Sequence, residues 1–343
     1  MSAQEQALQK LMLALLVIGH RIIHSNAMDF LSLLRDDIRE GLTQTSDAYR
    51  ARHTQWILSQ QCAEGGFANR RGKVDLYYTA FALRSLSSLN ELTPERARRA
   101  ADWLLSIARE PDSVRMRQPH GAFSDTVQAA SWWDSMILCE EAAGKMTGDA
   151  ERVEFSALTF ERIYSMRRDD GGYAKTTIET HGSLYHTFIA ASLHARLGVA
   201  IPNEEKMRAF LHSLARPDGG FIENKYSKRP GTNGTSAGVF LCLILGELEG
   251  HEKHFDFIAS MRNEEGGFEA APSAPLADLL STYTALLTLK MGGRLNSDLL
   301  DAAAHYAREL EAPDGGYTGF ALESVLDCEY TFYGLGVESI VAG

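Results

Sequence analysis

The chain has 343 residues, of which 45% are hydrophobic and 23% are charged, an ordinary composition for a globular protein with a sizeable core. Its formal net charge of −11 lacks the basic surplus that is typical of nucleic-acid-binding proteins, so we expect no nucleic-acid partner. The four cysteines lie far apart and form no CxxC pair, which favours free thiols in a reducing compartment and predicts a cytoplasmic location.

An apolar run with Leu11–Gly19 as its core comes first in the chain. This core is about half of the roughly 18 residues that a membrane-spanning helix needs, so we expect no transmembrane span. We interpret residues 1–27 as an N-terminal extension with a helical pattern. A signal peptide is the alternative, because Lys10 precedes a short apolar stretch. Residues 28–343 are then expected to form a single domain.

A repeat of about fifty residues organises the rest of the chain. Gly-Gly-aromatic triplets begin at Gly65, Gly171, Gly219, Gly266 and Gly315, and the later ones recur every 47 to 49 residues. The first gap is about twice this period, and Gly121-Ala122-Phe123 supplies a degenerate copy within it. The sequence therefore predicts six repeats, which indicates a repeat architecture.

Each repeat contains two helix-patterned runs separated by the glycine turn, and the second run is the more apolar. In chain order the pairs are 53–61 with 77–86, 100–109 with 125–138, 159–168 with 186–197, 207–216 with 235–245, 254–263 with 281–291, and 302–310 with 330–340. No long strand-like alternation occurs. Apolar helices are expected inside a ring of more charged ones. We therefore predict an all-α fold, an α/α toroid of six helical hairpins with an inner ring of helices surrounded by an outer ring.

Several segments carry a family resemblance, among them "RPGTNGTSAG" (229–238), "LADLLSTYTALLTLKMGGRL" (276–295) and "VLDCEYTFYGLG" (325–336). Together with the repeat, they resemble the prenyltransferase and squalene-cyclase family over residues 50–343, and within it the β subunit of type II protein geranylgeranyltransferases. The resemblance implies an isoprenoid diphosphate of the geranylgeranyl type in a central aromatic-lined cavity, and its transfer to a nucleophilic acceptor. It also implies a helical-repeat partner subunit or an acceptor protein.

The transferases of this family hold a catalytic zinc at the starts of their fifth and sixth inner helices, through an Asp, a Cys and a His. By resemblance these positions are Asp278, Leu280 and Tyr330. Leucine cannot bind zinc and a phenol replaces imidazole poorly, so Asp278 is the one matching ligand and we expect no metal or other cofactor. Asp327 matches another family acid. The candidate catalytic residues are thus Asp278, Asp327 and Tyr330; a relocated site that includes Cys328 and a purely helix-capping role for Asp327 are the alternatives.

The diphosphate site that the resemblance implies has also lost residues, since Ser236 occupies the position of a family histidine. Lys228 and Arg229 in the fourth-repeat loop remain as candidate cations for binding the diphosphate. The alternative is that they are simply solvated, as basic loop residues commonly are. The candidate cavity lining is a set of aromatic side chains and one histidine near the inner-helix starts, for which core packing is the alternative. This set comprises Tyr77, Tyr78, Trp132, Trp133, Tyr185, His186, Tyr283 and Tyr333.

Two further functions remain open. The cyclases of the family protonate an alkene with an Asp at an inner-helix start, and the nearest equivalent is Asp125, which is also a plausible helix cap. A terpene cyclase that uses Asp125 is one alternative to prenyl transfer. A non-catalytic binding toroid is the other, because the repeat is stronger evidence for the fold than for the chemistry.

Overall fold

The computed structural model describes residues 29–112, 121–247, 252–272 and 274–343. The predicted N-terminal extension, residues 1–27, lies outside these ranges. Within them, the helices alternate between an outer and an inner position. The outer helices are α3 (Asp47–Ser59), α5 (Pro94–Ala108), α8 (Asp149–Ser165), α10 (Glu204–Leu214), α12 (Glu252–Ala259) and α14 (Ser297–Leu310). The inner helices are α4 (Leu76–Ser88), α7 (Thr126–Ala143), α9 (Leu184–Arg196), α11 (Thr232–Ile244), α13 (Leu279–Met291) and α15 (Cys328–Ala342).

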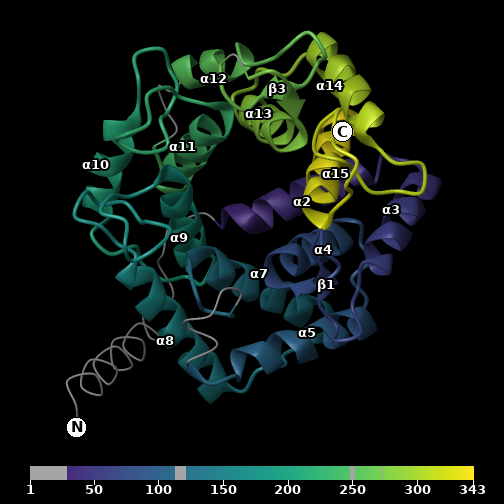
Figure 1. Cartoon of the computed structure of the whole chain (residues 1–343), viewed down its shortest axis with the longest axis vertical. Helices are drawn as coiled ribbons and strands as arrows, with labels where there is room; N and C mark the ends of the chain where they lie inside the picture. Colours follow the sequence, from purple (N-terminus) through teal and green to yellow (C-terminus); the bar gives the residue numbers. More distant parts are fainter. Residues whose placement is uncertain (1–28, 113–120, 248–251, 273) are drawn as a thin grey trace.

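The inner helices form a closed ring. Each of them packs against the next in chain order, and α15 packs against α4 to complete the circle (Figure 1). The predicted all-α toroid of six hairpins is therefore confirmed. The ring also explains why the inner helices are apolar on nearly all sides, because their outward faces are covered by the outer helices.

The same hydrogen bond joins the glycine turn to the inner helix in most repeats. The backbone N–H of the aromatic residue after the glycines donates to a threonine hydroxyl in the first turns of the inner helix. The pairs are Phe67–Thr79 (2.8 Å), Tyr173–Thr187 (2.9 Å), Phe221–Thr235 (3.0 Å), Phe268–Thr282 (3.0 Å) and Tyr317–Thr331 (3.2 Å). The threonines are buried, so this bond holds the turn at a fixed height on the inner helix.

Glycine is required in the turn for two reasons, which Gly219 illustrates. Its φ of 93° lies in the left-handed region, and a Cβ there would collide with the backbone carbonyl of Lys253 in the next outer helix. The turn therefore lies directly against the neighbouring repeat.

Two short antiparallel ladders were not predicted from the sequence. They pair β1 (Phe67–Ala68) with β2 (Val74–Asp75) and β3 (Phe268–Glu269) with β4 (Ala277–Asp278). Each strand has two residues, too few for an alternating pattern to be recognised. In each ladder, the aromatic residue that follows the turn glycines pairs with the residue that directly precedes the inner helix.

The glycine turn of the last repeat packs against the first outer helix. His53 of α3 accepts a hydrogen bond from the N–H of Gly316 at Nδ1 (3.1 Å), and its Nε2 lies 3.0 Å from a carboxylate oxygen of Glu311. Its ring also stacks on Tyr317, with centroids 5.1 Å apart. The outer ring is thus closed by a buried polar contact between the first and last repeats.

Among the described residues, one helix belongs to neither ring. The helix α2 (Phe30–Leu42) contacts α4, α9 and α15 and lies across the centre of the ring (Figure 1). Arg39 donates to the Ser87 carbonyl near the end of α4, Lys290 near the end of α13 pairs with Asp37 at 2.6 Å, and Arg196 of α9 pairs with Asp29 at 2.9 Å. The helix therefore covers the C-terminal ends of the inner helices.

Among the described residues, no helix is both long and apolar enough to cross a bilayer.

The threonine hydrogen bond gives a first prediction. Thr282→Val keeps the shape of the side chain but leaves the buried Phe268 N–H without an acceptor, so we expect the free energy of unfolding to fall by about 1–3 kcal/mol. Urea unfolding monitored by circular dichroism measures this change. Thr282→Ser retains the hydroxyl and should lose clearly less; an unchanged free energy of unfolding in Thr282→Val would show that the hydrogen bond does not stabilise the turn.

Candidate functional site

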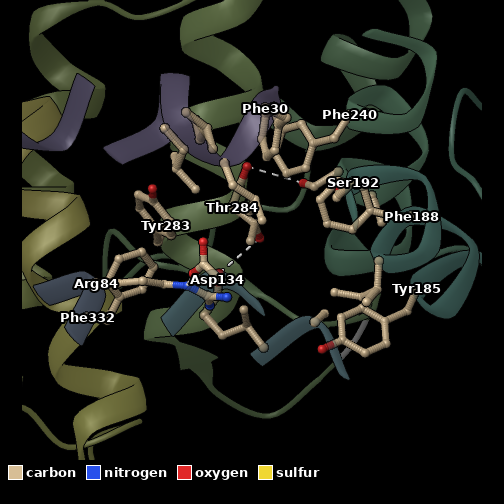
Figure 2. A pocket seen from close by; sticks show the side chains of 18 of the residues that line it. Phe30, Arg84, Asp134, Tyr185, Phe188, Ser192, Phe240, Tyr283, Thr284 and Phe332 are labelled. Carbon is tan, nitrogen blue, oxygen red and sulfur yellow. Dashed lines mark hydrogen bonds and ion pairs between the residues drawn. The ribbon is translucent and has the colours of Figure 1, made fainter. Parts of the chain in front are cut away.

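A cavity of about 400 Å³ occupies the centre of the ring. All the inner helices and α2 contribute side chains to it, and Figure 2 shows them converging from different sides. The volume lies within the range of about 300–1,000 Å³ that is usual for small-molecule sites. The aromatic members of its lining are Phe30, Tyr77, Phe81, Tyr185, Phe188, Phe240, Tyr283, Phe332 and Tyr333.

The aromatic side chains pack on one another around the cavity. Phe81 of α4 lies 5.5 Å from Phe332 of α15, and Tyr283 of α13 lies 6.0 Å from the same ring, measured between centroids. Phe30 of α2 stacks on Phe240 of α11 at 4.7 Å. The cavity is therefore walled by aromatic edges and faces from different helices, and the faces can attract a positively charged group.

A carboxyl group lies at the end of the cavity where the inner helices begin. Glu329, in the first turn of α15, lines the cavity and accepts a hydrogen bond of 2.8 Å from the Tyr77 hydroxyl. Burial raises the pKa of Glu329, and the hydrogen bond from Tyr77 lowers it less than burial raises it. The nearby Asp327 carboxylate also raises this pKa. Glu329 therefore keeps its proton to a higher pH than an exposed glutamate.

Asp327 and Tyr330 lie beside the cavity and not in its lining. Asp327 caps α15 by accepting the Tyr330 N–H (2.8 Å), and its carboxylate pairs with Arg70 at 2.6 Å. The Arg70 guanidinium also lies 5.3 Å from the centroid of the Tyr330 ring. Burial raises the pKa of Asp327, although the Tyr330 N–H and Arg70 act to lower it. The helix-capping alternative for Asp327 thus describes its observed contacts.

Asp278 has a similar capping position. It accepts hydrogen bonds from the N–H (2.7 Å) and the hydroxyl (2.8 Å) of Ser281, whereas Leu280 points its apolar side chain into the cavity. The described part of the chain contains no cluster of three His, Cys, Asp or Glu side chains suited to a metal. Burial raises the pKa of the Cys328 thiol as well. The residues at the family's zinc positions therefore do not fit a zinc ion, because one ligand is apolar and another is a phenol.

Three predicted residues lie on α7 or at its N-cap and do not line the cavity. Asp125 caps the helix, with Oδ1 2.8 Å from the N–H of Gln128. Trp132 and Trp133 are fully buried and point outward, donating to the Leu104 carbonyl of α5 (2.8 Å) and the Thr159 hydroxyl of α8 (2.6 Å). The interpretation of the two tryptophans as ligand contacts needs correction, because they anchor α7 to the outer ring.

The other predicted residues divide into two groups. Tyr77, Tyr185, Tyr283 and Tyr333 line the cavity. The remaining four lie outside its lining: Tyr78 and His186 are half-buried, and Lys228 and Arg229 are exposed on the fourth-repeat loop. His186 keeps a local contact, with Nδ1 2.9 Å from the Ser183 hydroxyl, and burial lowers its pKa.

The sequence interpretation missed a charged group at the opposite end of the cavity. Arg84 of α4, Asp134 of α7 and Arg196 of α9 all line it, and Arg196 is the last residue of α9. Arg84 Nε lies 2.5 Å from Asp134, and Arg196 lies 3.6 Å from the other oxygen of the same carboxylate (Figure 2 shows the first two). A charged residue inside an otherwise apolar helix was the signal that could have revealed them.

Comparisons with known proteins agree with this architecture. The family of the prenyltransferase alpha-alpha toroid domain matches residues 24–198 and 141–342. The chain therefore belongs to this family. Drimenyl diphosphate synthase from Streptomyces showdoensis is 28% identical over 167 residues, which are 45% of this chain but only 30% of that protein.

Two solved structures share the fold at low identity. Protein geranylgeranyltransferase-I from Candida albicans, complexed with GGPP, is 11% identical with a TM-score of 0.62, and the match covers 83% of this chain and 89% of that one. A variant of the type II terpene cyclase MstE from Scytonema, in complex with the substrate geranylgeranyl dihydroxybenzoate, is 12% identical with a TM-score of 0.56, covering 91% and 97%. At such identity the likeness concerns the fold alone.

The pKa of Glu329 gives a prediction about stability. The folded chain holds this proton to a higher pH than the unfolded chain, so the folded wild type loses stability as the pH rises from about 4.5 through the raised pKa. Glu329→Gln cannot ionise and avoids this loss. The unfolding free energy of the variant, minus that of the wild type, should therefore increase between about pH 5 and about pH 8 in urea titrations.

The exposed Glu205→Gln on α10 is the matched control for replacing a carboxyl by an amide. A difference for Glu329→Gln that stays constant with pH would show that this carboxyl ionises as readily in the folded chain as in the unfolded one.

Proposed function

We propose that the chain binds a linear isoprenoid in the central cavity and cyclises it, with Glu329 as the proton donor. The observation that carries this proposal is the cavity itself, which is enclosed by every inner helix and lined mainly by aromatic and aliphatic side chains. An isoprenoid offers apolar surface along its whole length, which such walls can cover. The GGPP, geranylgeranyl dihydroxybenzoate and drimenyl diphosphate in the names of the similar proteins belong to the same chemical class and support the proposal.

The protonated Glu329 carboxyl supplies the first step. Its O–H bond breaks and a C–H bond forms at a terminal alkene carbon, which leaves a carboxylate and a tertiary carbocation. An internal alkene then donates its π electrons to form the ring C–C bond, and loss of a proton to a base restores an alkene, so the whole reaction is an isomerisation. The aromatic faces stabilise the positive charge and exclude water from it.

Zinc-dependent transfer to a thiol is the less favoured function. Its metal positions hold Leu280 and Tyr330, and the Arg70 side chain nearby already pairs with Asp327 and Glu323. Lys228 and Arg229 remain candidates for a diphosphate only through the family resemblance. Prenyl transfer and non-catalytic binding stay predictions that the following assays also test, and a partner subunit stays a prediction from the family resemblance.

Filling the cavity should abolish binding. Ala130 of α7 lines it, and Ala130→Phe places a ring in that space, so we expect at least a ten-fold loss of affinity for farnesol and geranylgeraniol. Competition for a fluorescent prenyl probe measures the affinity. Ala51→Phe, at an exposed position of α3, is the matched control, and circular dichroism checks folding of both. Undiminished affinity in Ala130→Phe would place the isoprenoid elsewhere.

Removing the proton donor should abolish turnover without abolishing binding. We expect Glu329→Gln to lower kcat about 10²- to 10⁴-fold while the affinity for substrate stays within a few-fold of the wild type. Gas chromatography and mass spectrometry of extracts detect a cyclic isomer, and a parallel assay with geranylgeranyl diphosphate and a thiol detects transfer. Asp125→Asn separates the two candidate acids: loss of activity in that variant alone would overturn the assignment of Glu329. Binding without turnover would indicate a binding module.

A further inference from the structure

The closed end of the cavity, next to α2, is polar although the walls are apolar. The guanidinium of Arg84 projects into the cavity from α4, and Asp134 holds it through Nε at 2.5 Å. Arg196, whose side chain is 3% exposed, approaches Asp134 from α9 at 3.6 Å. Burying such groups beside an apolar space is costly unless their hydrogen bonds are used.

Several donors at this end lack an acceptor within the described ranges. Arg196 Nε and the Ser192 hydroxyl are buried and have no hydrogen-bond partner there. The two residues are one helical turn apart on α9, so they share a face, and both line the cavity. For the Arg84 guanidinium, the described residues accept only from Nε, and Arg84 also lines the cavity. This is a set of converging donors around one end of an apolar cavity.

The charges of these groups are already compensated. Arg196 contacts Asp29 at 2.9 Å and Glu141 at 3.8 Å in addition to Asp134, and Arg35 pairs with Glu141. The guanidinium groups therefore face a comparable number of carboxylates, and no surplus positive charge remains for an anion. An uncharged oxygen acceptor satisfies the free donors without adding a buried charge.

We propose that Arg84, Ser192 and Arg196 form a subsite for an uncharged oxygen atom, a hydroxyl or a carbonyl, at the head of the bound isoprenoid. This inference rests on the proposed function, because it assumes that the cavity holds an isoprenoid. It also orients the ligand: the oxygen-bearing head lies at the closed end beside α2, and the terminal alkene lies at the other end, where Glu329 is situated. The substrate class is thus a prenyl alcohol or prenyl carbonyl compound, and not a diphosphate seated at this end.

The test compares three ligands that share a chain: farnesol, the hydrocarbon with CH₃ in place of CH₂OH, and the corresponding carboxylic acid. Competition for a fluorescent prenyl probe gives the dissociation constant of each for the full chain. The measured quantity is the ratio of the hydrocarbon constant to the farnesol constant, because comparing this ratio between variants cancels the hydrophobicity of the chain. We expect the ratio to fall about ten-fold in Arg84→Met and about five-fold in Ser192→Ala.

Ser135→Ala is the matched control, since Ser135 is also buried with an unpartnered hydroxyl among the described residues but does not line the cavity. Its ratio should equal that of the wild type. An unchanged ratio in Arg84→Met and Ser192→Ala, with farnesol still bound, would overturn the subsite and leave the proposed function standing. Tighter binding of the acid than of farnesol, lost in Arg84→Met, would overturn the assignment to an uncharged oxygen. Failure of all three ligands to bind would overturn the proposed function itself.

Discussion

The hydrogen bond from the aromatic N–H to the inner-helix threonine is the constraint on which the ring depends. In each of five repeats it joins the glycine turn, which already rests on the next outer helix, to a buried position on the inner helix. One small contact therefore fixes three elements relative to one another. Because it recurs with the same geometry, the inner helices begin at one common level, and the side chains of their first turns meet around the cavity.

The cavity that results has two chemically different ends. Where the helices begin, Glu329 is held with Tyr77 in surroundings that favour its protonated form. Where they end, Arg84 and Arg196 present hydrogen-bond donors whose charge is balanced by carboxylates. Aromatic walls join the two ends. An apolar chain with one polar head matches this arrangement, and the proposed proton donor and the proposed anchor at opposite ends would give such a chain a direction.

The fold was predictable because its signal is repeated: the helix pairs and the toroid follow from spacing, apolar pattern and family resemblance. The site was less predictable. Inner helices are apolar on all sides, so their periodicity cannot distinguish a cavity-facing Tyr283 from an outward-facing Trp132. The pairing of Arg84 with Asp134 joins different repeats, and only the ring geometry brings them together. The recurring threonines could have been noticed, since each follows its aromatic residue by 12 or 14 positions.

The glycine turn of the last repeat packs on His53 of the first, so the repeats form a closed circle with no terminal repeat. An open solenoid can gain or lose a hairpin at its terminus and keep the curvature of the rest, whereas here an additional hairpin would force every neighbouring pair of helices to a new angle. The diameter of the central space is therefore fixed by the number of repeats and is not open to gradual adjustment. In the part of the chain that the structure describes, evolution can reshape this space through the side chains that point inward and through α2, a covering helix that stands outside the repeat.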